Sequence, residues 1–421
     1  MYSDEYYLNQ LSYFLVFIPI FARKYTIMIT EELQKLYLAY TGVPAENITE
    51  LPSSGSNRRY FRLAGVQTLI GVYGTCIDEN EAFLYMAAHF RRCGLPIPEI
   101  HIVSEDKTYY LQEDLGDTLL FHAIEKGRAT SVFSEDEKEL LRKTIRLLPA
   151  IQFAGADGFD FSRCYPQPEF NQRSILWDLN YFKYCFLKAT GMEFQEDKLE
   201  DDFQKMSDVL LRSSSATFMY RDFQSRNVMI KDGEPWFIDF QGGRKGPFYY
   251  DIASFLWQAK AKYPDSLRQE LLQEYIEALR KYQPIDEPYF YSQLRHFVLF
   301  RTLQVLGAYG FRGYFEKKPH FIQSVPYAIG NLRELLKEEY PEYPYLCKVL
   351  RAGGVSPLYF LRNYGVLLAV SVMCCTPLIE KLWDVLRKNV VTRCAAILTL
   401  LVVSTAYVVG STNSPFLYFN F

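Results

Sequence analysis

The chain has 421 residues, of which 49% are apolar and 23% charged, so we expect one large or two moderate globular domains. Its formal net charge is −3 and it contains no basic run, which argues against a nucleic-acid partner. None of the eight cysteines forms a Cys-x-x-Cys pair, so the sequence indicates neither a zinc site nor a disulfide framework.

Residues 1–27 are interpreted as a hydrophobic leader that is appended to the fold. Their apolar run, "YFLVFIPIF", is too short to span a bilayer and follows acidic residues instead of the basic region of a signal peptide. A second methionine, Met28, precedes "ITEELQKLYLAY", where Thr30 is expected to cap a helix over 30–46. Whether the chain starts at Met1 or Met28 stays open.

The segment from 48 to 117 predicts a small sheet crossed by one helix. Turn residues between alternating apolar residues indicate strands joined by a tight loop within 48–74, and "EIHIVSEDKTYYLQEDLGD" indicates two more strands. Between them, "ENEAFLYMAAHFRRCGLPIP" is typical of an amphipathic helix that ends at Gly94. From residue 118 onward helical periodicity dominates, until prolines and two glycines indicate a linker over 341–360.

One stretch interrupts the helical region: "FMYRDFQSRNVMIKDGEPWFIDFQGG", residues 218–243. A turn at Asp232-Gly233 would join two short strands and bring the end of the second strand beside Asn227. Asp222, Asn227 and Asp239 would then converge. Carboxylate and amide oxygens are ligands for Mg²⁺, which bridges substrate phosphates, and a further aspartate could accept a proton from an attacking hydroxyl. These are the parts that phosphoryl transfer needs.

"YRDFQSRN…IDFQ" resembles the catalytic and metal-binding loops of the aminoglycoside phosphotransferase and choline kinase-like family, and "GRKGPFYYDIASFLW" extends the match. The resemblance implies an α+β, bilobal, protein kinase-like fold with a β-rich N-lobe (28–115) and a mainly helical C-lobe (116–340). It implies ATP and Mg²⁺ as cofactors, Asp222 as the catalytic base, Asn227 and Asp239 as metal ligands, and Asp251 as a structural anchor. The strand that holds adenine would comprise Gln112, Glu113, Asp114 and Leu115.

Within this family, "SSGSNRRYFRL" and the glutamine of "IDFQ", Gln241, are similar to the anomeric kinases of N-acetylmuramate and N-acetylglucosamine. That similarity implies phosphorylation of a sugar hydroxyl at C1, in cell-wall recycling, with Gln241 in the substrate site. The aromatic-rich helix expected over 174–191 is core by default. Asp178 and Asn180 in it are nonetheless expected to face the sugar, since carbohydrate sites combine carboxylates and amides with aromatic faces.

The expected nucleotide loop departs from the family pattern. Its turn contains Ser53, Ser54 and Gly55, whose backbone N–H groups and hydroxyls could bind phosphates. The next strand, "TLIGVYG", has no lysine for the α- and β-phosphates, so Arg59 or Arg62 is expected to supply the positive charge. The missing lysine leaves open a membrane-tethered, nucleotide-binding pseudokinase as an alternative. A second alternative is a kinase of the same family for another acceptor (an aminoglycoside, choline or homoserine).

Residues 361–421 form a hydrophobic tail in which 363–379 and 394–410 carry no charge. As helices of 17 residues, each would reach about 25 Å, at the short edge of a ~30 Å hydrocarbon core. The runs fit either buried helices or membrane insertion, and we expect a cytoplasmic kinase body tethered to the inner face of the membrane. Basic residues between the runs conflict with a two-span hairpin on this side. "STNSPFLYFNF" also resembles the end of membrane-bound O-acyltransferases, but the tail lacks the histidine that acyl transfer needs.

Overall fold

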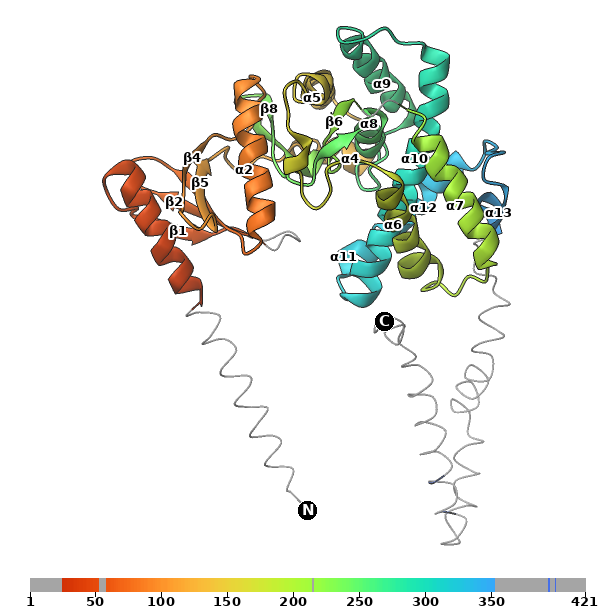
Figure 1. Ribbon diagram of the computed structural model, residues 1–421, viewed down its shortest axis with the longest axis horizontal. Helices are drawn as coiled ribbons and strands as arrows, with labels where there is room; N and C mark the ends of the chain where they lie inside the picture. The colour runs from red at the N-terminus through yellow and green to blue at the C-terminus, as the bar shows by residue number, and fades with distance from the viewer. Residues whose placement is uncertain (1–24, 53–57, 214–215, 353–392, 394–397, 399–421) are drawn as a thin grey trace. The chain divides into compact units, whose positions relative to one another are not determined.

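The computed structural model describes residues 25–52, 58–213 and 216–352, together with the single positions 393 and 398 (Figure 1). The chain divides into two compact units, Met1–Arg351 and Ala352–Phe421. The expectations for the tail and for most of the leader fall on residues outside the described ranges. Within those ranges, no helix has the length and apolar character needed to cross a membrane.

An antiparallel five-stranded sheet forms the N-terminal part, in the order β1-β2-β3-β5-β4. Its strands are β1 (Asn47–Glu50), β2 (Arg59–Ala64), β3 (Leu69–Tyr73), β4 (Ile100–Val103) and β5 (Tyr109–Glu113). Helix α2 (Ile77–Arg92) connects β3 to β4 and ends beside Gly94, whose φ of +72° suits a glycine after a helix end. The predicted sheet with one crossing helix is confirmed.

The two faces of this sheet bury different side chains, because residues alternate between the faces of a strand. Phe61, Leu63 and Leu111 point to one face, where they pack against Leu33 and Tyr37 of the helix over 25–41. Residues of opposite parity, among them Ile70, Val72 and Tyr110, join the main core that includes α2. Figure 1 shows helix 25–41 and α2 on opposite sides of the sheet.

The first helix lies earlier in the chain than predicted. It is helical from residue 25, the first residue described, to residue 41, where Gly42 follows with a φ of +81°. Thr30 is therefore inside the helix, and its hydroxyl donates to the Ile27 carbonyl instead of capping. Residues 25–27 thus belong to the fold and not to a leader, as the hydrogen bond between the hydroxyls of Tyr25 and Tyr73 (2.7 Å) also indicates.

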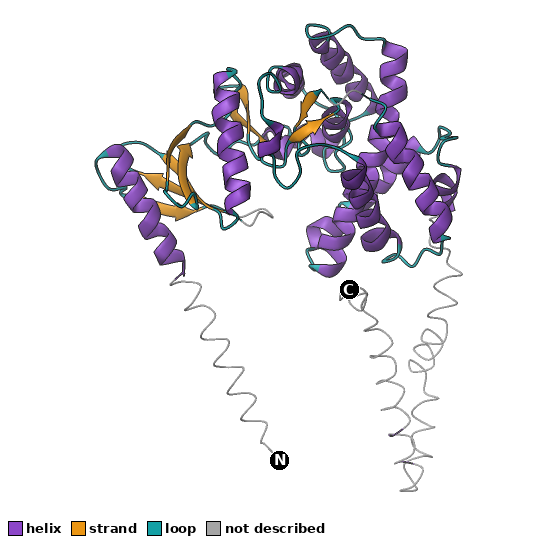
Figure 2. Ribbon diagram, viewed as in Figure 1, coloured by secondary structure: helices purple, strands orange, loops and turns teal. Residues whose placement is uncertain are grey.

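Helices dominate the rest of the described chain (Figure 2). They are α3 (Leu120–Ala123), α4 (Glu125–Thr130), α5 (Glu135–Phe153), α6 (Gln172–Phe182), α7 (Glu196–Leu210), α8 (Tyr249–Leu256), α9 (Asp265–Leu279), α10 (Glu287–Gly310), α11 (Pro319–Ile322), α12 (Val325–Leu335) and α13 (Pro344–Ala352). The long helix α10 packs against α6, α8 and α12. The predicted α+β class, with a β-rich N-terminal region and a mainly helical remainder, is confirmed.

The prediction of a linker over 341–360 is wrong for its first half, where the structure has a helix. Residues 344–352 form α13, which buries Leu346, Cys347 and Val349, and the Leu346 N–H donates to the Asp202 carboxylate at 2.9 Å. Pro344 stands in the first helical turn, where a missing N–H costs nothing, so a proline that was interpreted as a linker signal begins a helix. The five cysteines within the described ranges are free.

Candidate active site

The predicted hairpin forms and positions the central motif. Strands β7 (Val228–Lys231) and β8 (Glu234–Phe237) pair antiparallel, with Asp232 and Gly233 at φ of +54° and +77° in the turn between them. Positive φ at both turn residues is typical of the tight turn that matches the twist of two strands. Beyond the pair, the Ile238 N–H donates to the Asn227 carbonyl at 3.0 Å, which brings Asp239 beside Asn227.

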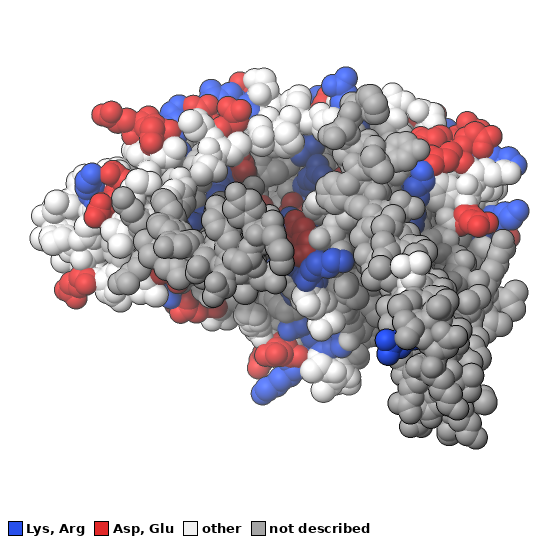
Figure 3. All heavy atoms as spheres, turned by 90° about the horizontal axis from the view of Figure 1, so that it is seen from below, with Lys and Arg blue, Asp and Glu red and all other residues white. Residues whose placement is uncertain are grey.

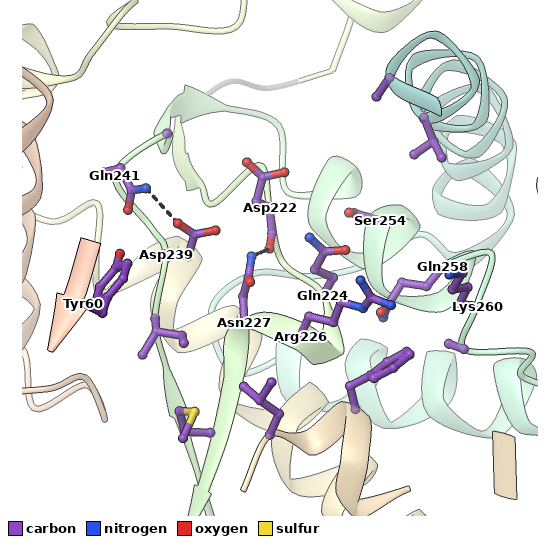
Figure 4. Close-up of a pocket in the computed structure, with 18 of the residues that line it drawn as sticks. Tyr60, Asp222, Gln224, Arg226, Asn227, Asp239, Gln241, Ser254, Gln258 and Lys260 are labelled. Carbon is purple, nitrogen blue, oxygen red and sulfur yellow. Dashed lines mark hydrogen bonds between the residues drawn. The ribbon is translucent and has the colours of Figure 1, made fainter. Parts of the chain in front are cut away.

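Asp222, Asn227 and Asp239 converge on one cleft of about 1590 Å³ (Figure 4). The side-chain N–H₂ of Asn227 donates to the backbone carbonyl of Asp222 at 2.8 Å, so its oxygen stays available for a cation. One oxygen of Asp239 accepts from the Gln241 amide at 2.7 Å. Gly242 leaves room beside Asp222, since a Cβ there would lie 3.7 Å from a carboxylate oxygen.

The charge distribution around Asp239 favours a bound cation. Burial and the neighbouring Asp222 carboxylate raise the pKa of Asp239, while the hydrogen bond from Gln241 and the charge of Arg58 offset part of this rise. A divalent ion would reverse the repulsion between the two carboxylates. The described residues contain no group of three or more His, Cys, Asp or Glu that could hold a metal alone, so an ion at Asn227 and Asp239 would take water and substrate phosphates as further ligands.

Asp251 in α8 anchors the loop that contains Asp222, which we call the catalytic loop, through hydrogen bonds to its backbone. The carboxylate of Asp251 accepts the backbone N–H groups of Tyr220 and Arg221, both at 2.9 Å, and the Gln152 amide at 3.2 Å. These bonds support Arg221 at a φ of +73°, a left-handed conformation that a non-glycine residue adopts at a cost of about 1–2 kcal/mol. Asp251 is fully buried, and this burial raises its pKa to about 7 despite the three donors. The expected anchoring role is confirmed.

Two further side chains connect the catalytic parts. Tyr220, which stands where the family usually has histidine, donates its hydroxyl to the Ile238 carbonyl and so links the catalytic loop to the segment before Asp239. Arg301 from α10 reaches to 4.0 Å from the Asp222 carboxylate and is held by the Ser254 hydroxyl at 3.1 Å. The sequence contains no signal for Arg301, because it lies 79 positions beyond Asp222 in an ordinary helical pattern.

The predicted adenine-binding segment lies along the cleft. Gln112, Glu113, Asp114 and Leu115 all line it. The backbone N–H of Glu113 donates to the Glu99 carbonyl at 2.8 Å. The Asp114 carboxylate binds the Arg62 guanidinium through two hydrogen bonds of 2.7 and 3.1 Å.

Neither arginine that was expected to replace the missing lysine fits that role. Arg62 faces the cleft, but Asp114 and Asp117 both pair with it at 2.7 Å, so it fastens the sheet to the segment that follows β5. Arg59 lies on the other face of β2, where its guanidinium pairs with Glu50 at 2.7 Å. The two-residue alternation of the strand explains why Arg59 points away from the site.

A third arginine, Arg58, which the sequence interpretation passed over, lies near Asp239 but is not among the residues that line the cleft. It lies just before β2, is 3% exposed, and donates to the Glu79 carbonyl at 3.1 Å, with the Glu79 carboxylate 3.6 Å away. Its guanidinium also lies over the Phe83 ring at 5.2 Å, and its charge lowers the pKa of Asp239. Three arginines occur within five positions, and the sequence alone does not distinguish the one whose charge acts on Asp239.

The predicted sugar-binding residues of α6 are not in the cleft. Asp178 and Asn180 are absent from its lining, and Asp178 instead pairs with Arg221 at 3.2 Å. Burial raises the pKa of Asp178, and Arg221 lowers it in part. The side chain of Asp178 is thus engaged by the segment that carries Asp222, and the predicted contact of Asp178 and Asn180 with the sugar stays a prediction. Gln241 does line the cleft, and Ser53, Ser54 and Gly55 lie outside the described residues.

A loop and a hairpin that bring two carboxylates and an amide oxygen together, between a five-stranded sheet and a helical body (Figure 1), define a phosphotransferase of the kinase type. The chain belongs to the phosphotransferase enzyme family, whose model matches residues 47–285. The resemblance that the motifs indicated, and the predicted enzyme class, are therefore confirmed.

Among proteins of known function, the chain is similar to an N-acetylmuramate/N-acetylglucosamine kinase of Neisseria meningitidis serogroup B, with 25% identity over 75% of this chain and 89% of that protein. A kinase of the same name from Pseudomonas putida is 23% identical over 78% of this chain and 96% of the relative. Among solved structures, the GDP and kanamycin complex of the aminoglycoside phosphotransferase APH(2″)-IIIa matches with a TM-score of 0.50 at 12% identity, covering 72% of this chain and 99% of that one. This last likeness concerns the fold alone.

Proposed function

We propose that this protein transfers the γ-phosphoryl group of ATP to the anomeric hydroxyl of N-acetylmuramate or N-acetylglucosamine. The observation that carries the proposal is the convergence of Asp222, Asn227 and Asp239 in a chain that is similar over most of its length to kinases named for these sugars. The reaction forms a bond between the C1 oxygen and the γ-phosphorus and breaks the bond from that phosphorus to the β–γ bridging oxygen.

In this proposal Asp222 orients the C1 hydroxyl and accepts its proton. Its side chain is 46% exposed to the cleft and unobstructed by Gly242, so a hydroxyl can approach it. Asn227 and Asp239 would hold Mg²⁺, since each keeps an oxygen that is not engaged by the Asn227–Asp222 and Gln241–Asp239 hydrogen bonds. Bound Mg²⁺ would neutralise charge on the β- and γ-phosphates.

The nucleotide would lie between the sheet and the hairpin. We assign adenine to the segment from Gln112 to Leu115 and the phosphates to the turn with Ser53, Ser54 and Gly55. Arg58 is assigned the cationic role of the missing lysine, because Glu79 of α2 holds it near Asp239 as an acidic partner holds that lysine in many kinases. Gln241 is then a positioning residue that orients Asp239.

A coupled assay for ADP release with a panel of amino sugars tests the function. Phosphate should appear on C1 of N-acetylmuramate or N-acetylglucosamine, which nuclear magnetic resonance of the product can locate. Turnover with choline, homoserine or an aminoglycoside, but with neither sugar, would show that the acceptor is wrong while the phosphotransferase assignment stands.

We further propose that residues 361–421 associate with the cytoplasmic membrane while the kinase body stays on its inner face. The support is the absence of charge in 363–379 and 394–410. Fractionation of the full chain against a chain truncated after residue 350 tests this proposal. Recovery of both forms in the same fraction would refute it.

A further inference from the structure

The end of the cleft that lies away from Asp239 is basic. Arg226, Lys260, Arg312 and Lys318 line it, and we call these four residues the acceptor-side cluster. They come from a short turn of the catalytic loop (Ser225–Asn227), from the segment after α8, and from the chain that joins α10 to α11. In Figure 3, basic and acidic side chains lie next to each other near the middle of the face.

All four cations are close enough to influence one imidazole, that of His320, and Arg226 also influences Lys260. Burial and the charges of Arg226 and Arg128 lower the pKa of Lys260. Burial lowers the pKa of His320, and so do the charges of all four members of the cluster. Like charges that face one open volume repel, so an anion in that volume would stabilise the arrangement.

The protein compensates this charge only in part. Glu316 pairs with Lys318 at 2.8 Å and with Arg312 at 3.5 Å. Within the part of the chain that the structure describes, neither Arg226 nor Lys260 forms an ion pair. Arg226 instead lies over the Phe121 ring at 4.4 Å, which orients its guanidinium without neutralising it.

The cluster lies on the side where the acceptor must bind. Figure 4 shows Arg226, Gln258 and Lys260 on one side of Asp222 and Asn227, with Asp239 and Tyr60 of the sheet on the other. The nucleotide belongs with the sheet and the metal ligands, so the side of Arg226 and Lys260 is left for the second substrate. Arg226 is only four residues from Asp222, and both line the same cleft.

We propose that the preferred acceptor carries a carboxylate and that the acceptor-side cluster, chiefly Arg226 and Lys260, binds it. This inference rests on the proposed function and makes it narrower. Of the two sugars, N-acetylmuramate bears a lactyl carboxylate and N-acetylglucosamine is neutral, so the cluster favours N-acetylmuramate. A polycationic acceptor such as an aminoglycoside would be repelled.

The test is the ratio of kcat/KM for N-acetylmuramate to that for N-acetylglucosamine. A charge-assisted contact to a carboxylate corresponds to about 10- to 100-fold in affinity, so we expect the wild-type ratio to exceed ten and to fall by about that factor in Lys260→Met and in Arg226→Met. Methionine keeps the apolar stem of either side chain. Lys337→Met, which removes the same charge from a residue that is 70% exposed and outside the cleft lining, should leave the ratio unchanged.

Failure of this inference can be told apart from failure of the proposed function. The inference about the acceptor-side cluster is wrong if both sugars are turned over with a kcat/KM ratio near one. It is also wrong if Lys260→Met and Arg226→Met do not alter that ratio. In either case the proposed kinase activity still stands. If neither sugar is phosphorylated, calorimetric titration of N-acetylmuramate still decides. The site is supported if the wild type and Lys337→Met bind N-acetylmuramate and Lys260→Met does not. It is overturned if Lys260→Met binds the sugar as well as the wild type does, or if the wild type does not bind it. Thermal unfolding of each variant shows whether it is folded.

Discussion

Asp251 offers the sharpest test of how the fold maintains the catalytic loop. Replacing it by asparagine keeps the size of the side chain but leaves one oxygen to serve two backbone N–H groups, those of Tyr220 and Arg221. The amide N–H₂ of the variant would then face one of these donors. A buried N–H without an acceptor costs about 1–3 kcal/mol, so we expect the free energy of unfolding at neutral pH to fall by that amount.

The same substitution should also lower the activity. The left-handed backbone conformation at Arg221 costs about 1–2 kcal/mol. When the Asp251 carboxylate no longer supports it, this backbone can relax and displace the adjacent Asp222. A displacement of roughly 1 Å at a reacting group can reduce turnover on the order of 100-fold, so we expect kcat to fall by about that factor with the KM for ATP little changed.

Urea denaturation and steady-state kinetics measure the two effects, and Asp286→Asn is the matched control. Asp286 caps α10 by accepting the Tyr289 N–H at 3.2 Å, and asparagine caps a helix equally well, so this variant should behave as wild type. An Asp251→Asn protein with unchanged stability and unchanged kcat would refute the view that these hydrogen bonds position the loop.

Other substitutions test the base, the metal ligand, the cationic residue and the buried carboxyl. Asp222→Asn should lose most of kcat, on the order of 10³-fold, while fluorescence titration finds nucleotide affinity retained; unchanged ATP consumption with sugar would remove Asp222 from the role of base. Asp239→Asn should raise the Mg²⁺ concentration needed for half-maximal turnover by at least about tenfold, and a magnesium titration that matches wild type contradicts the ligand assignment. Arg58→Met should lower kcat/KM for ATP about 10- to 100-fold, whereas Arg59→Met, which breaks contacts with Glu50 and Thr26 away from the cleft, should not. Because burial raises the pKa of Asp251 to about 7, its carboxyl binds a proton more tightly in the folded than in the unfolded chain, and the stability it contributes is lost as pH rises from about 4 to about 7. The difference in unfolding free energy between wild type and Asp251→Asn should therefore be larger at pH 5 than at pH 8, and a difference that grows with pH would contradict the assignment.

Local patterns in the sequence predicted the central hairpin and the sheet around the cleft. The turn at Asp232-Gly233 depends on two residues that tolerate positive φ, and the distance from Asn227 to Asp239 results from the length of two paired strands. The order of apolar and polar residues in β2, β3 and β5 likewise separates the two faces of the sheet. The turn conformation and the alternation of apolar residues depend only on residues close together in the chain. Both can therefore be predicted from a single sequence.

Choices among similar residues required the tertiary structure. Arg58, Arg59 and Arg62 have the same chemistry, and only their distances from Glu79, Glu50 and Asp114 distinguish their roles. The start of the first helix was missed by several residues because Thr30 is as compatible with a cap as with a helix interior.

The chemistry of the site is already present in the linear chain, as two aspartates and an asparagine at a spacing that a hairpin makes adjacent. The surroundings of these three residues depend on the folded arrangement instead. Packing places Asp178 against Arg221, and it gathers Arg226, Lys260 and Arg312 from distant segments into the cleft that Asp222 also lines. This division arises because strand pairing and turn conformation act between near neighbours in the chain, whereas charge clusters and ion pairs depend on how helices pack over long sequence separations.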